Sequence, residues 1–428
     1  MFDQNGLSLD QAPPISVVLR FFLSGALFGI VAGLLILVFN TAIFDPAAIE
    51  AVILTHTLTL GVMLSFMFAA LFQMLPVIAG VKLTAPVRKA NMLQYPFILG
   101  VIVLLFAFYS GKVLLFTIAS FLLGGAILSI TVTMLRELLK LPNHSSSSKG
   151  MSIALIALGI LTILALYMTG TLGGIFEGMH YLQVKQAHFT FGLFGWIALL
   201  IISISFQVIE MFYVTPSYPT LMHKHLPLSL LILIGTGTLL SPIIADVWSF
   251  VTPLLALLMV LYALITLKRL TQRKRPITDA TVLLWRIGTG LLIASMLLML
   301  SADYSGYTIL AKLSYLSFAG FAISIVFAMF YKIVPFLTWF HLSSQGYFTA
   351  PMMHEVIHPK TAMRHFYIHS ATLLVLALSL FFSPLIYLGG FLTLLSFGWI
   401  LWQIIHAWRL YLHTQRTGEK FEMNIPTT

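Results

Sequence analysis

Residues 56–76 read HTLTLGVMLSFMFAALFQMLP, an apolar run broken only by a histidine at its start and by a few uncharged polar residues. A hydrocarbon core about 30 Å thick is crossed by roughly 20 such residues in a helix. Similar runs fill most of the 428-residue chain. The sequence therefore predicts an all-α fold, a polytopic membrane helix bundle with about twelve transmembrane helices. We expect the spans near 15–39, 51–80, 92–110, 112–139, 151–170, 181–212, 228–246, 248–267, 281–302, 307–337, 365–384 and 386–410.

The composition supports this prediction and limits the chemistry. The chain is 59% hydrophobic and 8% charged, whereas roughly a quarter of the residues of a soluble domain are charged. We therefore expect residues 1–428 to form a single transmembrane domain. Residues 1–14 lack a basic segment and a cleavage site, so no removable signal peptide is expected. The chain has no cysteine and 13 histidines, which excludes thiolate ligands and leaves histidine as the obvious metal ligand.

Basic residues follow every second predicted span, and this pattern predicts the orientation. They include Lys82, Arg88, Lys89, Arg136, Lys140, Lys149, Lys224, Arg273, Lys274, Arg275, Lys360, Arg364 and Arg416. Asp45, Glu50, Glu177, Asp246 and Asp303 lie mainly in the alternate connections. Because cytoplasmic loops are enriched in Lys and Arg, we expect an inner (cytoplasmic) membrane protein with both termini cytoplasmic. The net charge of +10 is then explained by the basic cytoplasmic loops. We therefore expect membrane lipid as a partner and no nucleic acid.

A weak internal repeat relates three of the spans. In each, a glycine is followed twelve positions later by a polar residue, in the pairs Gly61 and Gln73, Gly195 and Gln207, and Gly320 and Lys332. The pairs lie in the second, sixth and tenth spans, at a regular interval of four. This spacing predicts three four-helix units, at about 15–139, 151–267 and 281–410, around a pseudo-threefold axis, although chance similarity among apolar helices remains an alternative.

Two histidines are expected at the same depth inside the membrane. His56 lies about six residues inside the outer end of its span, and His188 about seven residues inside the outer end of residues 181–212. A histidine within a lipid-spanning helix is costly unless it faces the bundle and finds a partner. Neutral imidazole binds iron or copper through one nitrogen. A metal site is one interpretation, and a pair of interhelical hydrogen-bond donors is the other.

The number of spans, the threefold repeat and these two histidines resemble the haem-copper oxidase large subunit. The pattern H-x4-G at 56–61 and the following LPVIAG at 75–80 also resemble NnrS-type membrane haem proteins. The resemblance implies that His56 is an axial ligand of a haem b. It also implies that His188 occupies the position of a copper ligand.

The sequence departs from the oxidase pattern at the positions that form the oxygen-reducing site in that family. Residues 307–337 contain Tyr315, Ser317 and Lys332 but no histidine, and Gly192 stands where the family has a tyrosine. His223 and His225 lie on the expected cytoplasmic side, too far from His188 to complete a copper site.

We therefore expect no complete oxygen-reducing centre. The resemblance instead implies a haem b held by His56, His188 or both, with copper as an alternative occupant. The implied roles are electron transfer with a redox partner, binding of a diatomic gas such as nitric oxide, or a nitrosative-stress response. The aromatic side chains expected to wall a macrocycle are Phe189, Phe191, Phe194 and Trp196.

A second group of histidines is expected at the cytoplasmic face, comprising His341, His354, His358, His365, His369 and His406. His365 and His369 are four apart and share a helix face. A solvated interfacial cluster near Lys360 and Arg364 is one interpretation. A second metal or haem site formed by His354, His358, His365 and His369 is the other.

Residues 354–358 match H-E-x-x-H, the zinc metalloprotease pattern in which the glutamate activates water. Pro359 follows directly and disfavours the continuous helix that this motif needs. We therefore retain a membrane zinc protease only as a minor alternative, with Glu355 as its base.

Lys332 and Glu210 are charged residues near the cytoplasmic ends of their spans. Such residues begin proton or ion paths in some transporters, and in other proteins they extend to the interface or form ion pairs. An ion- or proton-coupled transporter is therefore the main alternative function.

Overall fold

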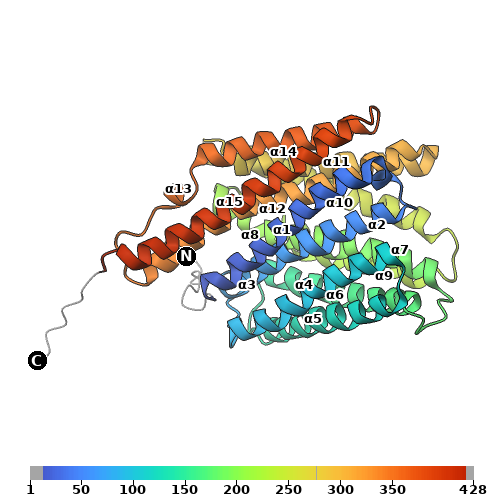
Figure 1. Ribbon diagram of the computed structural model, residues 1–428, viewed down its shortest axis with the longest axis horizontal. Coiled ribbons are helices and arrows are strands. Elements are labelled where there is room, and N and C mark those ends of the chain that lie inside the picture. Colours follow the sequence, from blue (N-terminus) through green and yellow to red (C-terminus); the bar gives the residue numbers. More distant parts are fainter. Residues whose placement is uncertain (1–12, 276, 421–428) are drawn as a thin grey trace, which may run out of the picture.

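The computed structural model describes residues 13–275 and 277–420. Within these residues the regular elements are helices and no strand is formed, so the predicted all-α bundle is confirmed. Figure 1 shows the long helices lying side by side along the long axis of the molecule. Their bounds are α1 Ile15–Phe39, η2 Asn40–Phe44, α2 Ile49–His56, η3 Thr57–Leu64, α3 Ser65–Ala79, α4 Pro86–Ser110, α5 Val113–Leu139, α6 Ser146–Leu172, α7 Tyr181–Thr190, η4 Phe191–Ala198, α8 Leu199–Tyr213, α9 Thr220–Leu240, α10 Val247–Thr271, α11 Ala280–Ser305, α12 Thr308–Ser344, α13 Met353–Val356, α14 Pro359–Ser379 and α15 Leu385–Thr417.

Ten helical segments among the described residues are long and apolar enough to cross a membrane. Two of them are composite: α2, η3 and α3 form Ile49–Ala79, and α7, η4 and α8 form Tyr181–Tyr213. The remaining two long helices, α9 and α14, have 21 residues each but begin with histidines and basic residues. Their polar first turns lower their mean hydropathy, so the total of twelve spans stays a prediction.

The helix ends follow local sequence chemistry. Pro86 and Pro359 occupy the first position of α4 and α14, where a missing backbone N–H costs nothing. Gly111 and Gly306 end α4 and α11 with φ of 65° and 72°, a left-handed conformation that is accessible to glycine without a Cβ penalty. These residues end the helices outside the apolar segments, so the unpaired backbone groups of the helix termini lie in the short connections.

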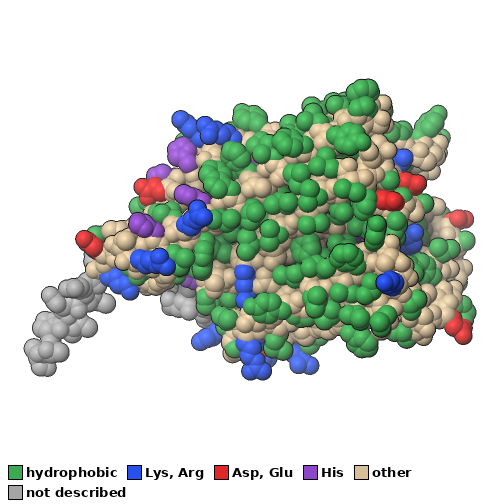
Figure 2. Space-filling model, in the orientation of Figure 1, with side chains coloured by type: hydrophobic (Ala, Val, Ile, Leu, Met, Phe, Trp, Pro, Cys, Tyr) green, Lys and Arg blue, Asp and Glu red, His purple; other side chains and the backbone are tan. Residues whose placement is uncertain are grey.

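The two ends of the bundle carry different charges. The described chain enters α1 and leaves α15 at the same end, on the left of Figure 1. Figure 2 shows most of the visible Lys and Arg, together with the visible histidines, at this end. We refer to it as the basic end and to the other as the opposite end. Residues 1–12 and 421–428, which include both termini and the segment searched for a signal peptide, lie outside the described residues.

Two spans contain a π-helix, η3 at Thr57–Leu64 and η4 at Phe191–Ala198. Each π-helix has eight residues, and the repeat glycine, Gly61 or Gly195, is the fifth residue of each. Wide π turns are rare and occur frequently at functional sites. Their matching position adds an observation in favour of the predicted repeat for the first two units, and the third unit has an ordinary α-helix there.

The centre of the bundle is packed by aromatic rings around close helix crossings. Phe22 of α1, Phe66 of α3 and Phe330 of α12 form a cluster of edge-on and tilted rings, with centroids 5.2 to 6.4 Å apart. Beside it, side chains of α3, α8 and α12, together with Phe22 of α1 and Trp285 of α11, line an apolar cavity of about 50 Å³. The three spans that carry the repeat therefore share this cavity.

Candidate haem site

The structure brings His56 and His188 together. His56 is the last residue of α2, directly before η3, and His188 is near the end of α7, directly before η4. Their ring centroids are 6.3 Å apart and their planes differ by 15°. The helix α2 packs on α4 and α7 packs on α6, whereas α2 and α7 do not pack closely on each other. The two imidazoles therefore meet between helices that make few direct contacts with each other.

The hydrogen bonds of the two imidazoles leave ligating nitrogens available. Nδ1 of His56 lies 2.8 Å from the carbonyl oxygen of Val52, and only a protonated nitrogen can donate to that acceptor. In the neutral ring, Nε2 of His56 then carries the lone pair, which is the arrangement that orients a metal-ligating histidine. Nδ1 of His188 is buried and makes no hydrogen bond of ordinary geometry.

One aromatic ring, that of Phe108, contacts the pair, and the sequence did not predict it. The ring of Phe108 on α4 lies 5.0 Å from His56 and 5.5 Å from Phe116 on α5. Phe189 packs edge-on against Tyr315 of α12 at 5.6 Å. The predicted wall residues Phe191, Phe194 and Trp196 are buried in the core. Phe108 was missed because nothing in the local sequence distinguishes it from the other phenylalanines of the chain.

The separation of the rings fits two axial ligands of one metal. Metal–nitrogen bonds are about 2 Å long, so two imidazoles on opposite sides of one ion have centroids roughly 6 Å apart. Among the described residues, no group of three or more His, Asp or Glu side chains is placed to hold a metal. Any metal at this pair therefore needs further ligands that these side chains do not supply.

The second group of histidines is not one cluster. His365 and His369 are 0% and 3% exposed, so the interpretation of a solvated interface is wrong for both. The reason is that α14 turns this face toward α12 and α15, which cover it. In contrast, His354, His358 and His406 are exposed. The structure therefore does not assemble His354, His358, His365 and His369 into one metal site.

The H-E-x-x-H segment is not a continuous helix. The helix α13 ends at Val356, and Ile357 is extended, with φ −133° and ψ 110°. A carboxylate oxygen of Glu355 accepts a hydrogen bond from the N–H of Met352 at 2.7 Å. His358 caps α14 by accepting from the N–H of Lys360 at 3.1 Å. These residues shape the start of two helices, and Pro359 explains the break.

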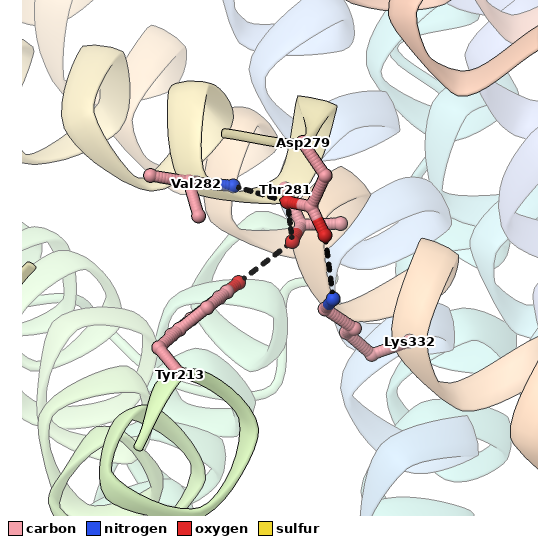
Figure 3. Close-up of polar contacts among 5 residues, drawn as sticks. All are labelled: Tyr213, Asp279, Thr281, Val282 and Lys332. Atoms are coloured by element: carbon pink, nitrogen blue, oxygen red, sulfur yellow. Dashed lines mark hydrogen bonds and ion pairs between the residues drawn. The ribbon is translucent and has the colours of Figure 1, made fainter. Parts of the chain in front are cut away.

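The two charged residues considered for a transport path have separate partners. Lys332 donates to a carboxylate oxygen of Asp279 at 2.8 Å. Figure 3 shows that Asp279 also accepts from the N–H of Val282 and from Thr281, to which Tyr213 donates. This network joins α8, α11 and α12. Glu210 accepts from the N–H of Tyr218 at 3.0 Å.

The Asp279 carboxylate should contribute to stability in a pH-dependent way. Burial raises its pKa, but the Lys332 ammonium and the hydrogen bonds from Thr281 and Val282 outweigh burial and hold the pKa below its ordinary value. A depressed pKa in the folded state stabilises fully above the unfolded value of about 4, and this contribution is lost as pH falls through the folded value. The ion pair is partly exposed, with side-chain exposures of 19% and 37%, so screening reduces its contribution.

Two variants separate the charge of Asp279 from its capping role. Asp279→Asn keeps a capping oxygen and should lower the free energy of unfolding by less than about 1 kcal/mol at neutral pH. Asp279→Ala also removes the cap of α11 and should cost about 1 to 2 kcal/mol. Thermal unfolding in detergent, measured from pH 7 downward, should show wild type and Asp279→Asn converging below about pH 4. A difference between them that is independent of pH would contradict the role of the ionised carboxylate.

No family model matches the sequence, and no curated protein matches it significantly. The chemistry of the site therefore has to be argued from the chain's own residues.

Proposed function

We propose that this chain is a membrane haem protein that binds haem b between His56 and His188 and transfers electrons to or from a redox partner. The observation that carries the proposal is the pair of near-parallel imidazoles with centroids 6.3 Å apart, each beside a π-helix. Two spans that are distant in the chain have thus placed one costly polar side chain each at a common point.

The small number of protein ligands at the pair favours haem over a bare metal ion. Zinc and copper sites in proteins generally use three or four protein ligands, and the described residues place no third His, Asp or Glu with this pair. A haem supplies the four equatorial nitrogens itself and takes only axial ligands from the protein. The ring of Phe108 contacts His56, and Phe189 follows His188 in the chain and packs on Tyr315. Such rings are suited to contact an apolar macrocycle.

Each residue has a distinct part in this proposal. The Val52 carbonyl fixes the tautomer of His56 and keeps its Nε2 directed away from its own helix turn. His188 supplies the second imidazole from α7. The two imidazoles would hold the haem, and bound haem would supply the one-electron chemistry that electron transfer requires. A gas such as nitric oxide would bind only where one imidazole leaves the metal.

An absorption spectrum with metal analysis tests the proposal directly. The protein, purified after expression with ample haem supply, should contain about one haem per chain and show the sharp reduced bands of six-coordinate b-type haem. Carbon monoxide should leave that spectrum unchanged. Binding of carbon monoxide by the native protein would instead indicate one axial ligand and gas binding. A folded protein with neither haem nor copper would refute the proposal and favour the transporter.

We further propose that the basic end faces the cytoplasm of an inner membrane, because basic connections are retained on that side. The chain has no cysteine, so a single introduced thiol is labelled without background. Asn143 and Asp246 are exposed residues in connections at the two ends.

The orientation is tested with Asn143→Cys and Asp246→Cys. An impermeant maleimide applied to intact spheroplasts should label Asp246→Cys and spare Asn143→Cys, and inverted vesicles should give the reverse. Labelling of both positions from one side would contradict the span assignment.

A further inference from the structure

A second pair of imidazoles is buried near the basic half of the bundle and takes no part in the proposed haem site. His365 and His369 on α14 have ring centroids 6.4 Å apart. Both rings lie edge-on to Phe327 of α12, at 4.7 and 5.0 Å, and Phe397 of α15 packs on that phenylalanine at 5.3 Å. Two titratable groups are thus enclosed by aromatic rings.

One nitrogen of each imidazole is hydrogen-bonded to a serine of a neighbouring helix. The hydroxyl of Ser324 donates to the Gly320 carbonyl at 2.6 Å, so its oxygen is left to accept from Nε2 of His369 at 2.9 Å. A hydroxyl has only one hydrogen, and His369 therefore carries its proton on Nε2. On the other side, Nε2 of His365 lies 2.9 Å from the hydroxyl of Ser396 on α15.

Three buried polar atoms on α14, α12 and α15 have no hydrogen-bond partner. They are Nδ1 of His365, the hydroxyl of Tyr331 and Nε2 of Gln403. The Tyr331 ring lies 5.7 Å from His365, and Gln403 lies two turns beyond Ser396 along α15, toward the basic end. Burying such atoms without a partner costs free energy, and ordered water is the usual partner in folded proteins. We therefore expect water between these atoms.

The surroundings contain no fixed charge that would explain the histidines as ion-pair partners. Within the described chain, no charged side chain of α11, α12 or α15 contacts either imidazole. The titratable neighbour from α12 is Tyr331, the polar neighbour from α15 is the uncharged Ser396, and within α14 each histidine is the other's neighbour. Ionisable groups inside a membrane domain typically mark proton relays or ion pathways.

We propose that His365, His369 and Tyr331 form a hydrated proton-binding site that exchanges protons with water at the basic end of the bundle. A hydronium ion transfers its proton to Nδ1 of His365, which leaves water and an imidazolium ring, and release reverses this step. The Tyr331 hydroxyl positions the water beside His365, Gln403 binds water further along α15 toward the basic end, and Ser396 and Ser324 hold the two rings. This site does not depend on haem binding at His56 and His188.

The test is a pH titration of ¹⁵N-histidine-labelled protein in liposomes, followed by solid-state nitrogen NMR. Each ring's signal is assigned as the one that is present in the wild-type spectrum and missing from the spectrum of His365→Asn or His369→Asn. In wild type we expect at least one of them to change from neutral imidazole to imidazolium between about pH 6.5 and pH 4, because burial without a counter-charge disfavours the charged ring. Exposed His406, identified with His406→Asn, provides the control for an ordinary solvated ring. Two rings that stay neutral throughout this range would overturn the proposal.

A second measurement keeps the proposal testable if a histidine variant fails to fold. Tyr331→Phe removes one hydroxyl and preserves the ring, so the fold should be retained. It should slow exchange of the imidazole N–H with D₂O by about tenfold or more and leave His406 unchanged. An unchanged rate would exclude Tyr331 from the path. Stoichiometric copper or zinc that is lost in His365→Asn would overturn the proposal in favour of a metal site.

Discussion

Replacement of both His56 and His188 by alanine is expected to abolish haem binding, with haem content falling more than about tenfold below wild type. Each single substitution should open one coordination position, because the remaining imidazole still holds the haem from one face. The single variants should then bind carbon monoxide in the reduced state, whereas wild type should not. Absorption spectra and pyridine haemochrome assays of the purified variants measure both effects.

The control for these variants is His406→Ala, which removes an exposed histidine of α15 and should leave haem content unchanged. Helical content and elution volume should be the same for all variants, since a single imidazole contributes modestly to packing across the bundle. If both single variants retained the six-coordinate spectrum of wild type, the haem would have to be bound elsewhere. Loss of haem in only one variant would identify a single axial ligand.

Gly29→Ala is expected to cause the largest loss of stability among single substitutions. Gly29 lies where α1 crosses α15, and an added Cβ would overlap the ring of Phe397, which is only 2% exposed. Small residues at such crossings allow the backbones of membrane helices to approach closely. Forcing a methyl group into a packed contact typically costs about 1 to 3 kcal/mol, which a thermal unfolding curve in detergent would detect.

The matched control is Gly125→Ala on α5, where an added Cβ meets no atom within 4 Å. Because alanine favours helix over glycine, by about 0.8 to 1 kcal/mol in soluble helices, this variant should be at least as stable as wild type. The double variant Gly29→Ala with Phe397→Leu should recover part of the loss, since the two positions are in contact and their effects are not additive. Equal stability of both glycine variants would contradict the close crossing of α1 and α15.

Much of the fold could be predicted from the sequence because a membrane imposes a simple rule. Apolar runs long enough to cross the hydrocarbon core become helices, since only a helix satisfies all the backbone hydrogen bonds within a single segment. All twelve predicted spans correspond to helical segments, with α2, η3 and α3 together forming the second. The composition could not decide whether α9 and α14 cross the membrane, because their polar first turns make them borderline.

The candidate site was predictable only as two residues at a common depth. Counting residues from the ends of two spans placed His56 and His188 at one level, and a rigid helix preserves that level. Whether the two faced each other depended on the rotation and packing of α2 and α7, which local sequence does not encode. The same limit explains why Phe108, which lies on α4, was missed.

The sequence by itself determined the fold class and the identity of the scarce polar groups inside the apolar segments, because both follow from composition and from position along a helix. Tertiary structure decided which of those groups meet. It paired His56 with His188, buried His365 and His369 against Phe327, and gave Lys332 the carboxylate of Asp279. It also used Glu355 and His358 to cap helices instead of joining them in one motif. The physical reason is that helix rotation and crossing are set by packing between segments distant in the chain.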